Sequence, residues 1–149
     1  MNTRPTVLIT GASTGIGAIY AERFAQRGHD LVLVARDQAR LNALAARLRG
    51  EHGVAVDVMT ADLTQLSDLT TVESRLRDDA RIGILINNAG AALSGNFIEQ
   101  STDSVAQLVA LNTTALVRLP VPLPRAWPKP VTARSSTSVR WSAWRRSSA

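Results

Sequence analysis

Hydrophobic positions along the chain alternate between short continuous runs and stretches with helical spacing. Apolar runs of five or six residues predict four buried strands, at Thr6–Thr10, Leu31–Ala35, Val54–Met59 and Ile82–Ile86. Apolar residues three and four positions apart follow each run and predict amphipathic helices. The last and longest of these stretches covers residues 102–119. The chain therefore reads as strands and helices in regular alternation.

Two of the predicted helices have glycines where the helical spacing stops. The first helix has an apolar face formed by Ile16, Ile19, Tyr20 and Phe24. Gly28 follows that face and Gly50 follows the next one, so both are expected to end their helices.

Strands that alternate with helices predict an α/β fold. Strand–helix–strand units place parallel strands in one sheet and helices on both of its faces. Right-handed crossovers make a doubly wound, Rossmann-like arrangement the leading topology. Only four strands are visible, so we expect a sheet truncated after the fourth strand. Its unpaired edge and uncovered apolar surface predict a poorly soluble product.

A glycine-rich turn separates the first strand from the first helix. Gly11, Gly15 and Gly17 give the spacing G-x-x-x-G-x-G, and Ser13 and Thr14 add hydroxyl donors. Glycine lets the backbone turn tightly and approach a diphosphate, and the helix that follows directs its free N–H groups at the anion. The turn predicts a dinucleotide site, and the alternative is a tight strand–helix turn with no ligand.

Composition excludes several classes of protein. The 149 residues suit one domain, and the absence of cysteine excludes disulfides and thiolate metal sites. With two histidines, no metal site is expected. No apolar run approaches the roughly 18 residues of a membrane helix, and no secretory signal is visible. These observations predict a cytoplasmic protein without a membrane partner.

Charge and composition divide the chain near Pro120. Residues 1–119 carry 11 Lys and Arg against 12 Asp and Glu, a formal net charge of −1. Residues 120–149 carry six basic residues, no acid, five of the six prolines and all three tryptophans. We therefore expect a folded body, residues 1–119, and a disordered tail, residues 120–149. A basic, Trp-containing tail leaves nucleic-acid binding as an alternative function.

Four motifs in the body resemble those of the short-chain dehydrogenase/reductase family. Thr10–Gly17 (TGASTGIG) is similar to the family's cofactor loop, and Asn87–Gly90 is its NNAG motif after the fourth strand. Asp62–Leu63 matches the pair that contacts adenine, and Asn112 matches the helix asparagine. The resemblance covers residues 6–119.

The resemblance implies hydride transfer between a nicotinamide cofactor and a small-molecule alcohol or carbonyl substrate. It implies cofactor binding by Gly11, Ser13, Thr14, Gly15, Ile16, Gly17, Arg36, Asp62, Leu63, Asn88, Ala89 and Gly90. It also implies that Asn87 ties strands together and that Asn112, the family's catalytic asparagine, opens its helix to hold a proton-relay water. The alternative for Asn112 is a solvent-facing side chain. A full-length member would be expected to form a homo-oligomer.

The residues after the second strand favour NADP over NAD. An acidic residue at this junction would bind the ribose 2′-hydroxyl of NAD, whereas Arg36 offers a charged donor fork to the 2′-phosphate of NADP. Asp37 follows directly, and we interpret it as the N-cap of the next helix.

The catalytic Tyr-x-x-x-Lys motif of the family is absent. Tyr20 is the only tyrosine and is followed four positions later by Phe24, and the only lysine is Lys129. We interpret Tyr20 as a core residue. The chain is therefore expected to be catalytically incomplete, and a non-catalytic dinucleotide-binding fragment is the alternative function.

The tail is compatible with a shifted reading frame. Joining the last base of each codon to the first two of the next lets the codons of Arg125–Ala149 encode a string containing GHGAIVNVSS. That string resembles the family's fifth strand and serine segment. A one-base insertion near Pro124 would explain the basic composition, so we expect no nucleic-acid partner.

Overall fold

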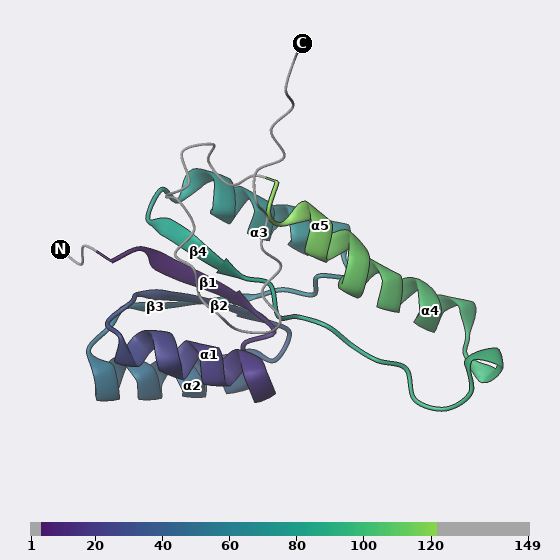
Figure 1. Ribbon diagram of the computed structural model, residues 1–149, viewed down its shortest axis with the longest axis horizontal. Helices are drawn as coiled ribbons and strands as arrows, with labels where there is room; N and C mark the ends of the chain where they lie inside the picture. The colour runs from purple at the N-terminus through teal and green to yellow at the C-terminus, as the bar shows by residue number, and fades with distance from the viewer. Residues whose placement is uncertain (1–3, 122–149) are drawn as a thin grey trace, which may run out of the picture.

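A single parallel sheet forms the centre of the molecule. The computed structural model describes residues 4–121. Its strands are β1 (Thr6–Thr10), β2 (Leu31–Ala35), β3 (Val56–Thr60) and β4 (Ile82–Ile86), in the order β3-β2-β1-β4 (Figure 1). Every neighbouring pair is parallel. This order confirms the predicted Rossmann-like α/β fold, and the third strand begins two residues later than expected.

Helices cover both faces of the sheet, as predicted. On one face lie α1 (Gly15–Gln26) and α2 (Gln38–His52), and on the other lie α3 (Leu66–Asp78) and a long interrupted helix (Figure 1). That helix consists of α4 (Thr102–Val109), the π-helical segment η2 (Ala110–Ala115) and α5 (Leu116–Arg118). A single 3-10 turn, η1 (Phe97–Glu99), precedes it. The predicted tail, apart from its first two residues, lies outside the described residues.

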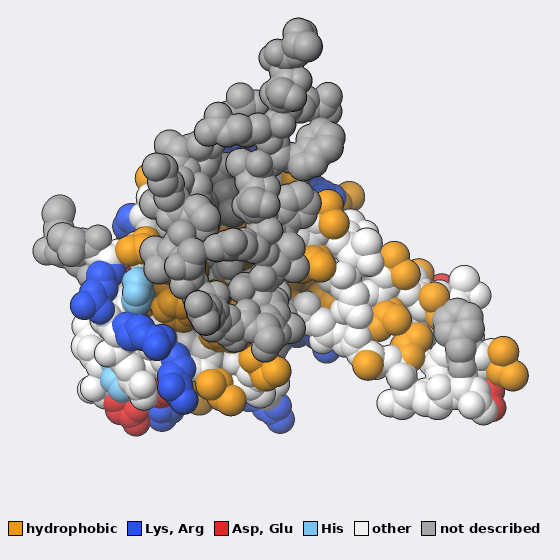
Figure 2. All heavy atoms as spheres, in the orientation of Figure 1, with side chains coloured by type: hydrophobic (Ala, Val, Ile, Leu, Met, Phe, Trp, Pro, Cys, Tyr) orange, Lys and Arg blue, Asp and Glu red, His pale blue; other side chains and the backbone are white. Residues whose placement is uncertain are grey.

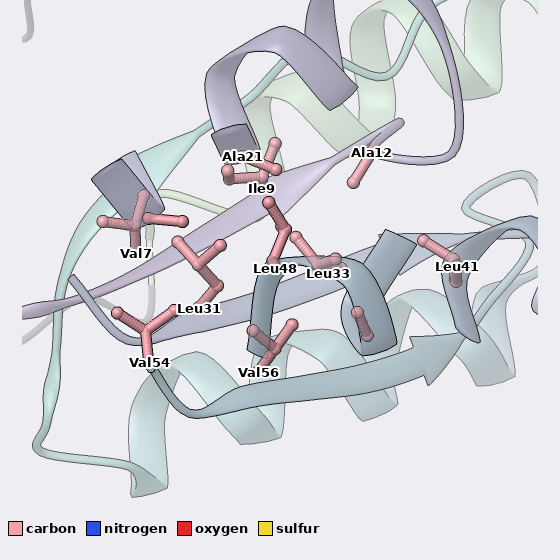
Figure 3. Packing of buried hydrophobic residues seen from close by; sticks show 12 residues of the cluster. Val7, Ile9, Ala12, Ala21, Leu31, Leu33, Leu41, Leu48, Val54 and Val56 are labelled. Carbon is pink, nitrogen blue, oxygen red and sulfur yellow. The ribbon is translucent and has the colours of Figure 1, made fainter. Parts of the chain in front are cut away.

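Alternation along the strands divides the core into two clusters. Val7 and Ile9 of β1 point toward α1 and α2, whereas Leu8 points toward α3. Figure 3 shows the first cluster, in which Leu33 of β2 and Leu48 of α2 lie close to Ile9 of β1. Each fully buried Val, Leu or Ile side chain stabilises the fold by about 1.5–3 kcal/mol.

The buried face of α1 differs from the predicted one. Ile16 and Ile19 are 64% and 58% exposed, and the buried residues are Gly17, Ala21 and Ala25. Small side chains let the helix approach the sheet closely, and the larger apolar residues therefore lie toward its flanks. Tyr20 and Phe24 are half-buried and pack against the edge of the core, which agrees with a packing role for Tyr20.

The end of α2 also differs from the prediction. Gly50 lies inside the helix, which continues to His52. Gly53 ends it in a left-handed conformation (φ 65°), and its N–H donates to the carbonyl of Arg49 at 3.0 Å. Gly28, with φ 75°, follows α1 as expected.

The outer side of β4 and one flank of the long helix remain without a partner among residues 4–121. Within that part of the chain β4 pairs only with β1. Val109 and Val117 are each about half exposed, and Figure 2 shows apolar side chains along the arm formed by α4. None of the described helices is long and apolar enough to span a membrane.

Candidate functional site

A cavity of about 390 Å³ lies at the carboxyl ends of β1, β2, β3 and β4. The strand order reverses at β1, and parallel α/β sheets bind ligands at such a switch point. The lining residues are Gly11, Ser13, Thr14, Ile16, Val34, Ala35, Arg36, Asp37, Ala61, Asp62, Leu63, Thr64, Asn88, Ala89, Gly90 and Leu111. Ten of the thirteen predicted site residues are among them; Gly15, Gly17 and Asn112 are not.

The glycines of the turn permit close contact between two backbone segments. Gly11 has φ 65°, and a Cβ there would lie 2.9 Å from the Cα of Ala89. A Cβ on Gly17 would overlap the carbonyl oxygen of Gly11 and lie 2.7 Å from Asn88 Nδ2. Gly17 therefore supports the turn from behind, and Gly15, with φ 55°, sets its curvature.

Thr10 joins the turn to the segment after β4. Its fully buried hydroxyl oxygen accepts hydrogen bonds from the backbone N–H groups of Asn88 and Ala89, both at 3.0 Å. In return, Asn88 Nδ2 donates to the carbonyls of Thr10 and Gly11 at 3.2 and 3.3 Å. These bonds hold one wall of the cavity in a single arrangement.

The start of α1 has the electrostatic character of an anion site. Its N-cap, Thr14, makes no capping hydrogen bond with its side chain, and the first turn contains no acidic residue. The positive end of the helix is therefore not compensated by its own residues, and it lies beside the cavity that Thr14 and Ile16 line. Together with the glycine-rich turn, this region fits a diphosphate.

The rim after β2 carries one cation and one acid. Arg36 is exposed and makes no hydrogen bond or ion pair with any residue in 4–121. Asp37 is the N-cap of α2, as predicted: its Oδ1 accepts from the backbone N–H of Arg40 at 3.0 Å. Its Oδ2 lies 3.2 Å from Arg40 Nε.

The neighbouring part of the rim is a short turn after β3. Asp62 Oδ1 accepts from the N–H and the hydroxyl of Thr64 at 3.0 and 2.7 Å, which fixes the carboxylate. The Asp62 N–H donates to Asp68 Oδ2 at 2.8 Å. Leu63 is buried in the core with one surface on the cavity.

Asn112 lies in the π-helical segment and binds the loop after β4. Its Nδ2 donates to the carbonyl of Ala91 at 2.7 Å, and its Oδ1 accepts from the Ala91 N–H at 3.0 Å. Asn87 Nδ2 donates to the carbonyl of Leu116 at 3.1 Å. Both asparagines thus connect the end of β4 to the long helix, and the proton-relay water of Asn112 remains a prediction.

Sequence reasoning did not single out several residues that line the cavity. Val34 and Ala35 end β2, and the rule that ligands bind at strand carboxyl ends could have found them. Thr64 directly follows Asp62–Leu63 in the sequence. Leu111 was noted only as the neighbour of Asn112, because its place on the cavity depends on how the long helix crosses the sheet.

A second polar cluster joins α1 to α2 away from the cavity lining. Ligand-type atoms of Glu22, Glu51 and His52 lie within 4.8 Å of one another. Arg47 Nη1 already lies 2.6 Å from Glu22 Oε2 and 2.9 Å from Glu51 Oε2. The hydrogen bond from His52, assisted by Arg47 and Gln26, holds the pKa of Glu22 below its usual range. We interpret this cluster as an ion-pair network between helices.

The strand order, the two helical layers and the glycine turn define a Rossmann-like α/β domain. A family model of the short chain dehydrogenases matches residues 5–128. The chain belongs to the short-chain dehydrogenase/reductase family.

Known proteins of this family align with the described part of the chain. A short-chain dehydrogenase from Sphingobium yanoikuyae, solved in complex with NADPH, is 68% identical with a TM-score of 0.79 and covers 80% of this chain and 46% of its own. The bulky-bulky ketone specific alcohol dehydrogenase from Comamonas testosteroni is 60% identical, with a TM-score of 0.81 and coverages of 82% and 49%.

A curated relative aligns over a similar region. An uncharacterized oxidoreductase of Staphylococcus saprophyticus is 32% identical over 106 residues, covering 70% of this chain and 45% of the relative. The chain therefore spans less than half the length of each of these three proteins.

Proposed function

We propose that this chain forms the cofactor-binding part of an oxidoreductase that transfers hydride between NADP(H) and an alcohol or carbonyl compound. The observation that carries the proposal is the cavity at the switch point. A glycine-rich turn, an uncompensated helix N-terminus and an arginine without a partner among residues 4–121 surround it. The names of two similar solved structures, one an NADPH complex and one a ketone-specific alcohol dehydrogenase, support the same chemistry.

NADP(H) suits the rim after β2 better than NAD(H). Arg36 has no partner among residues 4–121, so its guanidinium can bind a 2′-phosphate without breaking another interaction. Asp37, the one carboxylate at this junction, is held by Arg40. In this proposal the glycine turn and α1 hold the diphosphate, and Asp62 and Leu63 contact the adenine.

The residues of this chain bind and orient the cofactor but lack the family's acid–base pair. A bound nicotinamide would supply the hydride chemistry. Tyr20 packs against the core on α1, and Lys129 lies outside the described residues. An unassisted tyrosine, with a pKa near 10, is a weak base at neutral pH. We therefore propose that the chain binds NADP(H) without turnover.

A titration of both cofactors tests this function. Wild type is expected to bind NADPH about tenfold or more tightly than NADH, because a charge-assisted phosphate contact contributes about 1.5–3 kcal/mol. Arg36→Ala should remove that difference and leave the dissociation constant of NADH nearly unchanged. Arg77→Ala, at an exposed helix end outside the cavity, is the control. Equal affinity of wild type for the two cofactors would show the NADP assignment to be wrong.

An assay of alcohol oxidation separates the two forms of the proposal. Cofactor binding without turnover supports a non-catalytic dinucleotide-binding chain, whereas turnover would require an acid–base group other than a Tyr-x-x-x-Lys pair. The coding DNA of residues 120–149 tests the shifted frame directly. Codons that cannot yield GHGAIVNVSS in the second frame would exclude it.

A further inference from the structure

Asp37 occupies a position where a carboxylate could oppose NADP(H). It lines the cavity next to Arg36, at the junction where 2′-phosphate and 2′-hydroxyl are distinguished. A carboxylate at this rim repels a phosphate and offers an acceptor to a ribose hydroxyl. A free Asp37 would therefore weaken the discrimination that Arg36 provides.

The carboxylate of Asp37 is engaged on both oxygens by one residue. Oδ1 accepts from the backbone N–H of Arg40 at 3.0 Å, and Oδ2 lies 3.2 Å from Arg40 Nε. The Arg40 side chain is 64% exposed and does not line the cavity, whereas Asp37 does. The contact between Arg40 and the cavity lining therefore runs through Asp37.

We propose that Arg40 is a specificity-determining positioning residue. Its guanidinium neutralises the Asp37 carboxylate and occupies Oδ2, which lowers repulsion of a 2′-phosphate and withholds an acceptor from a 2′-hydroxyl. This inference rests on the proposed preference for NADP(H) and adds a second residue to it: Arg36 attracts the phosphate, and Arg40 removes an opposing charge.

The expected effect is modest and depends on salt. Exposed ion pairs change binding constants by about fivefold at most, and they weaken as ionic strength rises. Replacing the Arg40 side chain leaves its backbone N–H in place, so the N-cap of α2 is retained. Asparagine is as good an N-cap as aspartate, so Asp37→Asn also preserves the helix.

The experiment measures the dissociation constants of NADPH and NADH for the full chain and its variants. Arg40→Gln is expected to lower the preference for NADPH by about three- to fivefold at low salt, and less at high salt. Adding Asp37→Asn to Arg40→Gln should restore NADPH affinity, because the uncompensated charge is then gone. A purely structural role of Arg40 would not be reversed in this way.

Arg77→Gln serves as the matched control. It removes one charge from an exposed ion pair with Asp78 at the end of α3. The inference is overturned if Arg40→Gln leaves the NADPH preference unchanged, if Asp37→Asn fails to restore it, or if Arg77→Gln lowers it equally. Failure of the proposed function looks different: wild type itself would then bind neither cofactor or bind both alike.

Discussion

Gly17 is required because of contacts that a single methyl group would break. At Gly17 any Cβ meets the backbone of Gly11 and the amide of Asn88, neither of which can move without opening the cavity wall. Gly50, also helical, has nothing within 4 Å of its missing Cβ. The same residue type thus has opposite roles at two positions.

Alanine at each of these glycines should have opposite effects. Gly17→Ala is expected to lower the free energy of unfolding by about 1–3 kcal/mol through overpacking, and to weaken NADPH binding. Gly50→Ala should raise the free energy of unfolding by about 0.5–1 kcal/mol, because alanine favours the helix. Urea unfolding and NADPH titration of both variants check this. Equal stability changes in the two variants would contradict the packing argument.

For single residues, the sequence predicted which side chains line the cavity better than it predicted which side chains pack in the core. Gly11, Ser13 and Arg36 could be assigned to a cavity from their position after strands. The small residues of the buried face of α1 could not be predicted to be buried. A search for large apolar side chains at helical spacing passes over glycine and alanine. Ile16 and Ile19, which belong to the apolar face predicted from the spacing, are exposed instead.

The turn between α3 and β4 depends on a partly buried carboxylate. Asp79 ends α3, and its oxygens lie 2.9 and 2.8 Å from Arg81 Nε and Nη2. Arg75 approaches within 3.0 Å from the preceding turn of the helix and also pairs with Asp57 of β3. The hydrogen bonds from Arg81 lower the pKa of Asp79 to about 2.

This pKa predicts a loss of stability in acid. Because the folded pKa is depressed from 3.8 to about 2, the stabilisation is complete above pH 3.8 and is lost as the pH falls toward 2. Asp79→Asn should lower the free energy of unfolding at neutral pH by about 1–2 kcal/mol, since the largely exposed Arg81 is partly screened. Urea unfolding at neutral and acidic pH should show the two proteins converging in acid. A constant difference would contradict the assignment.

Elements were predictable where one local signal dominated. The strands on either side of the switch point were predicted residue for residue, because each is a continuous apolar run between breakers. The end of α2 was not predicted correctly, because glycine is tolerated inside a helix. Only the tertiary structure shows which of Gly50 and Gly53 adopts the left-handed conformation. The π-helical segment around Asn112 has no periodic signature at all.

At the scale of the whole molecule, the two faces of the sheet are unequally covered. The cluster under α1 and α2 includes Ile84 and Ile86 of β4, and both are only half-buried. On the other face Leu119 is fully buried, whereas Val109 and Val117 of the same long helix are about half exposed. Apolar surface of this kind favours association between copies of the chain.

Lysine on the long helix should therefore reduce self-association. The double variant Val109→Lys with Val117→Lys is expected to shift sedimentation toward the monomer, because each charge must be desolvated in an apolar contact. Leu66→Lys, at an exposed apolar residue on α3, is the control and should leave the distribution unchanged. If all variants sediment like wild type, association involves another surface.

The bonds from Thr10 to Asn88 and Ala89 also have a consequence for the folding reaction. They join residues 78 and 79 positions apart in the sequence. They also require that β4 has already paired with the central strand β1. Contacts so distant in sequence close late, because the entropy of a long loop must be overcome first. The cavity is thus among the last features to form, so a bound dinucleotide would act mainly by slowing unfolding and only weakly by speeding folding.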